Sequence, residues 1–469
     1  MKTILLILTL ALSHIFSDHA VLQQDTQTPV WGWGTPGTEV SVKASWTKKA
    51  VKAKVAADGS WRVVLATPKA DGMSHSIVVK SGKESLTIND VVLGEVWICS
   101  GQSNMEMPVR GFGFQGVEGS TEAIMAAPET ASDIRVFDIK EGMKEEPQKD
   151  VENVWELSTP GVAAKTSAIG YFFARRLTKS LGVPVGIIVN AWGGSRIEPW
   201  MTWDAINGAG LSEEELAEVR KLDESANRWP ETSELVWNGR VAPIVGFAAK
   251  GIMWYQGCSN VGQKCYDKLQ NAMVMQWRRA WDRDMPFIYT LLAPYDYGDA
   301  DGRGRPQFVE KQMRTANEVP NAWYVCTETI GERTVIHPAK KKEVADMMVM
   351  RALQDVYGMD CGINIGQPLP QTHEFGADGV VKVRLTNIWS DLMSITGREI
   401  KGFELAGEDH VFHLADAEID WDGNTILVRC AEVPHPIAVR YAWRNWMGAN
   451  LAKTQGIPVP PFRSDNWEY

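Results

Sequence analysis

The sequence predicts an α/β protein in which a doubly wound parallel sheet, with helices on both faces, lies between an N-terminal and a C-terminal β-domain. Three observations predict this fold: a first stretch of short alternating strands, a long middle stretch in which apolar strands alternate with helical segments, and a final stretch in which alternation returns. The length of 469 residues leaves room for about three domains of roughly 150 residues each.

The first β-domain is expected at residues 14–90. Runs such as Val40–Val42 and Trp61–Leu65 alternate between apolar and polar residues and are separated by Gly, Pro and Asp, which is typical of a small β-sandwich. Before it, Lys2 precedes an apolar run from Ile4 to Leu12 that is too short to span a bilayer, since a span needs about 20 residues. This pattern predicts a signal peptide at residues 1–13 and a secreted or periplasmic protein. The alternative is a first buried strand.

The middle domain is expected at residues 91–360. Apolar runs of strand length alternate there with longer segments of helical pattern, which favours a parallel sheet. The helix that ends at Leu181 is followed by Gly182, a residue suited to a left-handed cap, and the last helix begins at Pro338, a residue suited to a first helical position. The predicted strands are Gly94–Cys99, Val185–Asn190, Gly251–Tyr255, Pro286–Leu292 and Trp323–Thr327, and the predicted helices are Ala168–Leu181, Tyr266–Trp281, Phe308–Glu318 and Pro338–Tyr357.

The last domain is expected at residues 361–469. Alternation returns in Val380–Leu385 and Ile426–Cys430, which predicts a second β-domain.

Composition excludes several classes of function. The net charge of −10 and the lack of a basic run argue against nucleic-acid binding, and no segment is long and apolar enough for membrane insertion. The six cysteines form no CxxC pair and no zinc-ligand spacing, so no metal site is expected. A disulfide between Cys258 and Cys265 is left open, and no oligomeric state is predicted.

Polar residues follow the predicted strands at the points where each strand ends. Ser103 follows the strand Gly94–Cys99, Gly194 lies in the loop after Val185–Asn190, Asn260 follows Gly251–Tyr255, and His337 precedes the last helix. Ligands of open α/β sheets bind at the carboxyl ends of the strands, so these four residues are expected at one edge of the sheet.

These residue types suit acyl transfer. The hydroxyl of Ser103 is a nucleophile, and the imidazole of His337 is a base that titrates near neutral pH. The backbone N–H groups of Ser103 and Gly194 and the amide of Asn260 are donors for an oxyanion. Taken singly, each residue has an ordinary structural explanation as a turn, cap or loop residue.

Four blocks of sequence resemble the sialate O-acetylesterase family of the SGNH hydrolase superfamily. They are Val96–Glu106, which contains Ser-Gly-Gln-Ser-Asn-Met, then Asn190–Trp200, then Trp254–Asn260, and finally Ile336-His337-Pro338 followed by Lys341. The segments Phe16–Gln23 and Val439–Trp443 also resemble that family, so the resemblance covers essentially the whole chain.

The resemblance implies an SGNH-type fold in which Ser103 attacks an acetyl ester, His337 is its base, and Gly194 and Asn260 complete the oxyanion hole. It implies no cofactor and no metal. Gln256 and Arg196 are predicted to bind substrate, although Arg196 is equally suited to an ion pair with Glu198.

The sequence departs from the family pattern in two places, and the second concerns the base. Cys258 stands where the family often has Glu, and the positions that usually carry the acid of the triad hold Thr334 and Val335. The replacement partners considered are Glu332, Glu328, the Thr334 hydroxyl and a backbone carbonyl. Glu332, the nearest in sequence, is the predicted third member if a triad exists.

The leading hypothesis is a serine esterase that removes O-acetyl groups from carbohydrates, with O-acetylated sialic acid as the first substrate. An acetylxylan or other plant-glycan acetylesterase is the alternative. Because the acid of the triad is missing, a further alternative is a catalytically impaired, carbohydrate-binding relative of these esterases.

Overall fold

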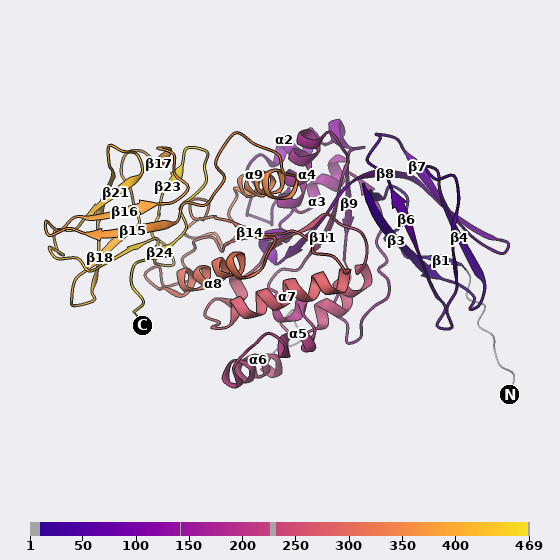
Figure 1. Ribbon diagram of the computed structural model, residues 1–469, viewed down its shortest axis with the longest axis horizontal. Coiled ribbons are helices and arrows are strands. Elements are labelled where there is room, and N and C mark those ends of the chain that lie inside the picture. The colour runs from indigo at the N-terminus through magenta and orange to yellow at the C-terminus, as the bar shows by residue number, and fades with distance from the viewer. Residues whose placement is uncertain (1–9, 141, 226–230, 468–469) are drawn as a thin grey trace. The chain divides into compact units, whose positions relative to one another are not determined.

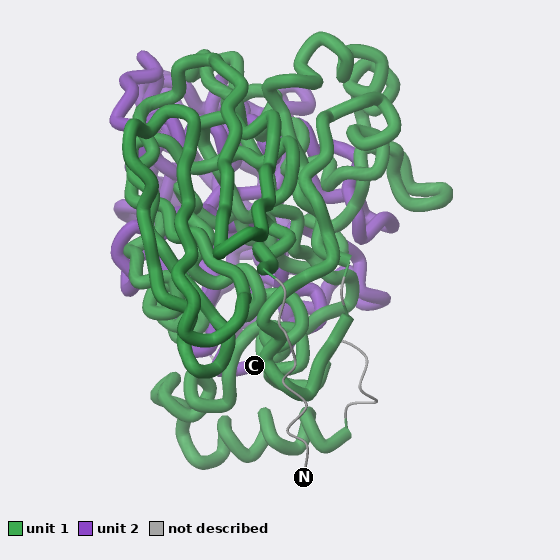
Figure 2. The backbone as a smooth tube through the Cα atoms, turned by 90° about the vertical axis from the view of Figure 1, so that its right-hand side faces the viewer, with its two compact units in different colours: residues 1–254, 272–287 green, residues 255–271, 288–469 purple. Residues whose placement is uncertain are grey.

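The computed structural model describes residues 10–140, 142–225 and 231–467 (Figure 1). The chain forms two compact units, residues 1–254 with 272–287 and residues 255–271 with 288–469 (Figure 2). Both units are discontinuous in sequence. Most of the predicted signal peptide, residues 1–9, lies outside the described residues, and Ala11–Leu12 forms strand β1.

The N-terminal strands belong to the first unit. In β6, exposed and buried residues alternate along the whole strand, as expected for a sheet with one face in a core. The antiparallel pairing of β3 with β6 and of β1 with β3 makes a three-stranded sheet. These strands are β1 (Ala11–Leu12), β2 (Val21–Gln23), β3 (Thr26–Trp33), β4 (Glu39–Ala44), β5 (Val51–Lys54), β6 (Ser60–Thr67) and β7 (His75–Ser81).

Strand β8 (Glu84–Gly101) joins the N-terminal strands to the central sheet without a loop. Its first part pairs antiparallel with β7, and its last part pairs parallel with β2 and β11. The change of partner occurs beside Asp90, whose φ of 51° lies in the left-handed region and whose neighbourhood contains a register shift. The predicted division between residues 90 and 91 therefore falls inside one continuous strand.

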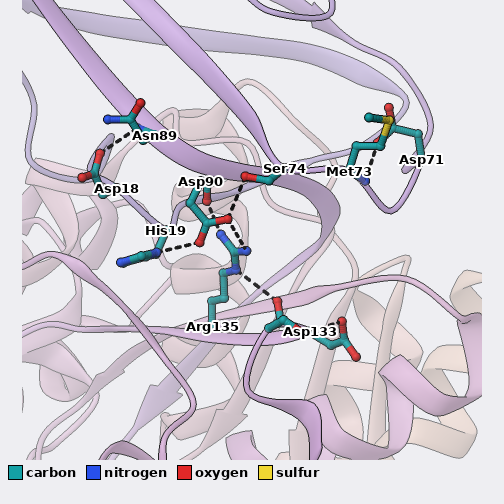
Figure 3. Close-up of polar contacts among 10 residues, drawn as sticks. Asp18, His19, Asp71, Met73, Ser74, Asn89, Asp90, Asp133 and Arg135 are labelled. Atoms are coloured by element: carbon teal, nitrogen blue, oxygen red, sulfur yellow. Dashed lines mark hydrogen bonds and ion pairs between the residues drawn. The ribbon is translucent and has the colours of Figure 1, made fainter.

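A polar network holds this bend (Figure 3). Nδ1 of His19 lies 2.7 Å from Oδ2 of Asp90, the Ser74 hydroxyl donates to Oδ1 at 2.9 Å, and the Arg135 guanidinium donates to Oδ1 at 3.2 Å and to the Asp90 carbonyl. Burial alone would raise the pKa of Asp90, but the bonds from His19 and Ser74 and the Arg135 charge hold it below its usual range.

The central sheet has the strand order β10-β9-β11-β8-β12-β13-β14. After β8 the chain forms β9, β10 and β11 on one side of β8. It then crosses to the other side and forms β12, β13 and β14. Strand β11 is buried along its whole length, as strands covered on both faces are. The strands are β9 (Ile134–Asp138), β10 (Trp155–Leu157), β11 (Val185–Ala191), β12 (Gly251–Tyr255), β13 (Phe287–Thr290) and β14 (Ala322–Val325).

Two helices, Ala168–Leu181 and Tyr266–Trp281, have the predicted bounds, whereas the helix predicted at Phe308–Glu318 begins at Gly304. The helix α4 is capped at its start by the Ser167 hydroxyl, which accepts from the Gly170 N–H, and at its end by Gly182 with a φ of 69°. The helices are α1 (Ser103–Glu106), α2 (Ser120–Met125), α3 (Pro160–Lys165), α4 (Ala168–Leu181), α5 (Trp203–Asn207), α6 (Glu213–Ser225), α7 (Tyr266–Trp281), α8 (Gly304–Glu318) and α9 (Lys341–Arg351).

The predicted start of the last helix at Pro338 is wrong, because α9 begins at Lys341. The Ala339 N–H donates to Oε1 of Glu332 at 2.7 Å, and the Lys341 N–H donates to the Ala339 carbonyl. These two bonds hold residues 338–340 in a turn instead of a first helical turn.

The C-terminal strands form two four-stranded sheets, in the orders β15-β16-β21-β20 and β19-β18-β22-β24, and the pair β17-β23. Their apolar side chains share one core that includes Val383, Leu405, Ile426 and Tyr441. The strands, orange to yellow in Figure 1, are β15 (Pro370–Phe375), β16 (Val381–Leu385), β17 (Leu392–Ser394), β18 (Phe403–Ala406), β19 (Phe412–Leu414), β20 (Asp416–Ile419), β21 (Thr425–Arg429), β22 (Ala438–Tyr441), β23 (Leu451–Lys453) and β24 (Phe462–Arg463).

Within the described residues, no helix has the length and apolar character that a membrane crossing requires. All six cysteines are free thiols, so Cys258 and Cys265 are not joined by a disulfide.

Candidate active site

Ser103 is the first residue of α1, directly after β8. Gly101 at the end of the strand has a φ of 134°, and Gln102 is extended and buried, so the chain turns sharply before the serine. Asn104 and Met105 are buried beneath the turn, and the Ser103 side chain stays half-buried. The strand therefore ends by presenting a hydroxyl at the carboxyl edge of the sheet.

The loop after β11 lies beside Ser103 because the two strands are in register. Ala191 pairs with Gly101, and the Trp192 N–H donates to the Gly101 carbonyl at 2.9 Å. A Cβ at Gly193 would lie 3.4 Å from the Cβ of Ser103. Gly194 has a φ of 74°, which favours glycine. The structure thus brings Ser103 together with the predicted Gly193-Gly194 loop.

Glu106 fixes this loop, and sequence reasoning missed it. Its Oε2 accepts the Gly193 N–H at 2.7 Å, and a Cβ at Gly193 would lie 2.7 Å from the same oxygen. Burial raises the pKa of Glu106, the Gly193 bond and the Arg240 charge lower it, and the Asp138 charge raises it further. The only available signal was an acidic residue three positions after the serine, one helical turn away.

The other side of the loop is braced by Ser195. Its hydroxyl donates to the Trp192 carbonyl at 2.8 Å and accepts from the indole N–H of Trp200 at 3.0 Å. With Gly193 held by Glu106, the flanks of Gly194 are fixed from two directions.

Arg196, predicted to bind substrate, forms a bidentate ion pair with Glu198. Nη2 lies 2.7 Å from Oε1 and Nε lies 3.3 Å from Oε2, and the two side chains are 11% and 3% exposed. The alternative role weighed from the sequence, an ion pair with Glu198, is the one that the structure records.

Asn260 belongs to the second unit and lies in a short 3₁₀ turn after β12. Its Oδ1 accepts from Nε2 of Gln256 at 2.7 Å, and its Nδ2 donates to Oε1 of Gln263 at 2.6 Å. The Tyr266 hydroxyl donates to Oε1 of Gln256 at 2.7 Å, which sets the orientation of that amide. Gln256 is therefore positioned to orient the Asn260 amide.

His337 also belongs to the second unit, in the turn before α9, and is half-buried. Burial and the positive charge of Lys341 lower its pKa to about 4. The imidazole is therefore neutral and able to accept a proton at ordinary pH.

The carboxylates considered as partners of His337 have other contacts. Oε1 of Glu332 accepts the Ala339 N–H at 2.7 Å. Glu328 is 2% exposed and forms an ion pair with Arg305, whose side chain is 1% exposed. Burial raises the pKa of Glu328 and the Arg305 charge lowers it.

Lys341 is a buried cation in the same block of sequence. It is 1% exposed, and its ammonium lies 5.9 Å from the centre of the Tyr255 ring. Burial lowers its pKa to about 7, against the opposing charges of Cys258 and Glu332. The sequence identified this lysine as part of the histidine block but assigned it no role.

Two cavities of the first unit lie at opposite ends of the parallel strands. One of about 560 Å³ lies at the carboxyl ends of β9 and β11, lined by Glu106, Trp192 and Gly193 among others. The other, of about 470 Å³, lies at the amino ends beside Asp90 and contains no predicted site residue. Within the described residues, no group of three or more His, Cys, Asp or Glu side chains could hold a metal ion.

Comparison with known proteins gives one consistent result. The profile of the family described as "Carbohydrate esterase, sialic acid-specific acetylesterase" matches residues 93–350. The sialate O-acetylesterase of Homo sapiens is 25% identical over 494 residues, covering 96% of this chain and 91% of its own length. The sialate O-acetylesterase of Rattus norvegicus is 26% identical over 512 residues, covering 95% and 92%.

A solved structure is similar over the whole chain. The crystal structure of a carbohydrate acetylesterase from Xanthomonas citri has a TM-score of 0.86 and 30% sequence identity, covering 98% of this chain and 100% of that one. The similarity therefore extends over the N-terminal strands, the central sheet and the C-terminal strands.

Proposed function

Since the chain belongs to the sialic acid-specific acetylesterase family of carbohydrate esterases and is a carboxylic ester hydrolase, we propose that Ser103 is its nucleophile and His337 its general base. The observation that carries this proposal is the contact of Ser103 with the Gly193-Gly194 loop at the carboxyl edge of the sheet. We also propose an SGNH-type doubly wound arrangement for this sheet, with Ser103 following the strand at which the order of the chain reverses.

The reaction follows from these groups. Oγ of Ser103 attacks the carbonyl carbon of the acetyl ester while its proton passes to His337. The N–H groups of Ser103 and Gly194 and the amide of Asn260 stabilise the oxyanion. Collapse of the tetrahedral intermediate breaks the bond to the sugar oxygen, which takes the proton from the imidazolium. Water, deprotonated by His337, then attacks the acetyl carbon, and the second tetrahedral intermediate breaks the bond to Oγ of Ser103. That oxygen takes the proton back from the imidazolium, and acetic acid leaves, ionised as acetate.

We propose that His337 and Ser103 act as a dyad. Burial and the Lys341 charge lower the His337 pKa, and both disfavour the imidazolium. Glu332 accepts a backbone N–H, and Glu328 pairs with Arg305. A base of low pKa is a weak proton acceptor, so the oxyanion donors carry a large share of the catalysis.

The proposed substrates are O-acetylated carbohydrates, with O-acetylated sialic acid first. The names of the human and rat relatives support this choice. Secretion stays a prediction, because residues 1–9 lie outside the described part of the chain.

The test is acetate release from an aryl acetate, an O-acetylated sialic acid and an acetylated xylo-oligosaccharide. The wild type should release acetate from the sialic acid faster than from the xylo-oligosaccharide, and Ser103→Ala should lose all three activities with an unchanged unfolding temperature. Full activity of Ser103→Ala would refute the proposed nucleophile, and a preference for the xylo-oligosaccharide would refute the proposed substrate.

A further inference from the structure

The cavity of about 560 Å³ at the carboxyl ends of β9 and β11 has no assigned role. Its volume is within the range of small-molecule sites, about 300–1,000 Å³. The residues that line it belong to the first unit and include Glu106, Phe112, Lys140, Lys165, Trp192 and Arg240.

The cavity adjoins the nucleophile. Glu106 and Gly193 line it, and the Cβ position of Gly193 lies 3.4 Å from the Cβ of Ser103. The cavity is therefore separated from the Ser103 side chain by no more than the Gly193 backbone that both contact.

The cavity has an aromatic surface held in one orientation. The Arg240 guanidinium lies 5.0 Å from the centre of the Trp192 ring. Arg240 itself is fixed, because its Nε donates to Oδ1 of Asn190 at 3.2 Å and its Nη2 donates to the Ile139 carbonyl. Trp192 and Phe112 thus give the cavity apolar surface that suits the C–H groups of a sugar ring.

The charged side chains that line the cavity differ in whether they already have a hydrogen-bond partner. Three cations, Lys140, Lys165 and Arg240, face two acids, Glu106 and Asp138. Glu106 is occupied by the Gly193 N–H, and Arg240 by Asn190 and Ile139.

Lys165 is the cation that stays available. It ends α3 and is exposed, and its ammonium has no hydrogen bond or ion pair to any residue that the structure describes. Lys140 is exposed on the same cavity, just past the end of β9. Two ammonium groups on one rim attract a carboxylate and leave a neutral sugar without a matching group.

We infer that this cavity is the glycosyl subsite of the esterase and that Lys165, assisted by Lys140, selects O-acetylated sugars that carry a carboxylate. This inference rests on the proposed function. It deepens that function by assigning the residues that distinguish an acidic sugar from a neutral one. From the sequence, Arg196 was the arginine predicted to bind substrate.

The experiment compares an O-acetylated N-acetylneuraminic acid with its methyl ester, which keeps the acetyl group and loses the carboxylate charge. Lys165→Ala should lower kcat/KM for the acid by about threefold to tenfold, mainly through KM, and Lys140→Ala by less. The methyl ester and an aryl acetate should be hydrolysed at the wild-type rate by both variants. Lys179→Ala, an exposed lysine at the opposite cavity, is the matched control and should match the wild type with every substrate.

Two results would overturn the inference while leaving the esterase assignment intact. In the first, Lys165→Ala lowers the rate equally with the acid and its methyl ester, which indicates a structural effect. In the second, it changes neither. Failure of the proposed function itself is a different result: an aryl acetate hydrolysis that does not depend on Ser103.

Discussion

The bond from the Gly193 N–H to Glu106 is expected to control the rate of the reaction although Glu106 takes no part in bond making. Oε2 of Glu106 holds the loop that carries Gly194, and catalysis depends on donors that are already in place when the oxyanion forms. Replacing Glu106 by Leu keeps the bulk of the side chain and removes the acceptor. Glu106→Gln keeps an acceptor oxygen and removes the charge.

The magnitude follows from the kind of bond. A hydrogen bond to a charged acceptor contributes about 1.5–3 kcal/mol, and we lower this to about 1–2 kcal/mol because Gly193 is only half-buried. If that energy orders the loop in the transition state, Glu106→Leu loses about 5-fold to 30-fold in kcat, since 1.36 kcal/mol is tenfold.

The assay is steady-state hydrolysis of an aryl acetate, with the unfolding temperature measured for each variant. Glu106→Leu should lose kcat with little change in KM, and Glu106→Gln should recover most of the loss. Equal losses of kcat in both variants would show that kcat depends on the negative charge of Glu106 and not on the hydrogen bond that holds the loop. Unchanged kcat in Glu106→Leu would refute the positioning role.

Three further substitutions test the oxyanion donor Asn260 and the surroundings of His337. Asn260→Ala should lower kcat by about 10²–10³ with little effect on KM, and a change confined to KM would contradict its role in the oxyanion hole. Lys341→Met should move the acid limb of kcat/KM upward from near pH 4, because the Lys341 charge is one cause of the low His337 pKa; an unmoved limb would contradict this coupling. Glu332→Gln should keep kcat within about threefold, whereas the charge of a triad acid contributes about 10⁴ in a serine protease.

Lys341 also has a predicted effect on stability. Its pKa falls from 10.5 in the unfolded chain to about 7 in the folded protein, so between these values the unfolded chain binds more protons. The free energy of unfolding should therefore rise with pH across this interval. Chemical denaturation of the wild type and Lys341→Met at several pH values measures this slope, which should be weaker in the variant.

Local signals predicted the elements around the site well. Gly182 marks the end of α4, and Gly251–Tyr255 and Tyr266–Trp281 have the bounds predicted from apolar periodicity. These features depend on residues that are close in sequence, so a single chain is enough to recognise them.

Contacts between distant residues were not predictable in the same way. Glu106 and Gly193 are 87 residues apart, and only the register of β8 with β11 brings them together. The start of α9 was misplaced because the Glu332 side chain takes the Ala339 N–H. The ion pair of Arg196 with Glu198 joins near neighbours, which is why the sequence already offered it as an alternative.

The central claim is that Ser103 forms a covalent acetyl-enzyme. The most direct measurement is mass spectrometry of the protein after rapid acid quenching of its reaction with an aryl acetate. We expect one added acetyl group on the peptide that contains Ser103. This group should be absent from Ser103→Ala and should form more slowly in Asn260→Ala, in line with the reduced kcat of that variant. Acetate release without an acetylated Ser103 peptide, or an acetyl group on another residue in the active wild type, would contradict it.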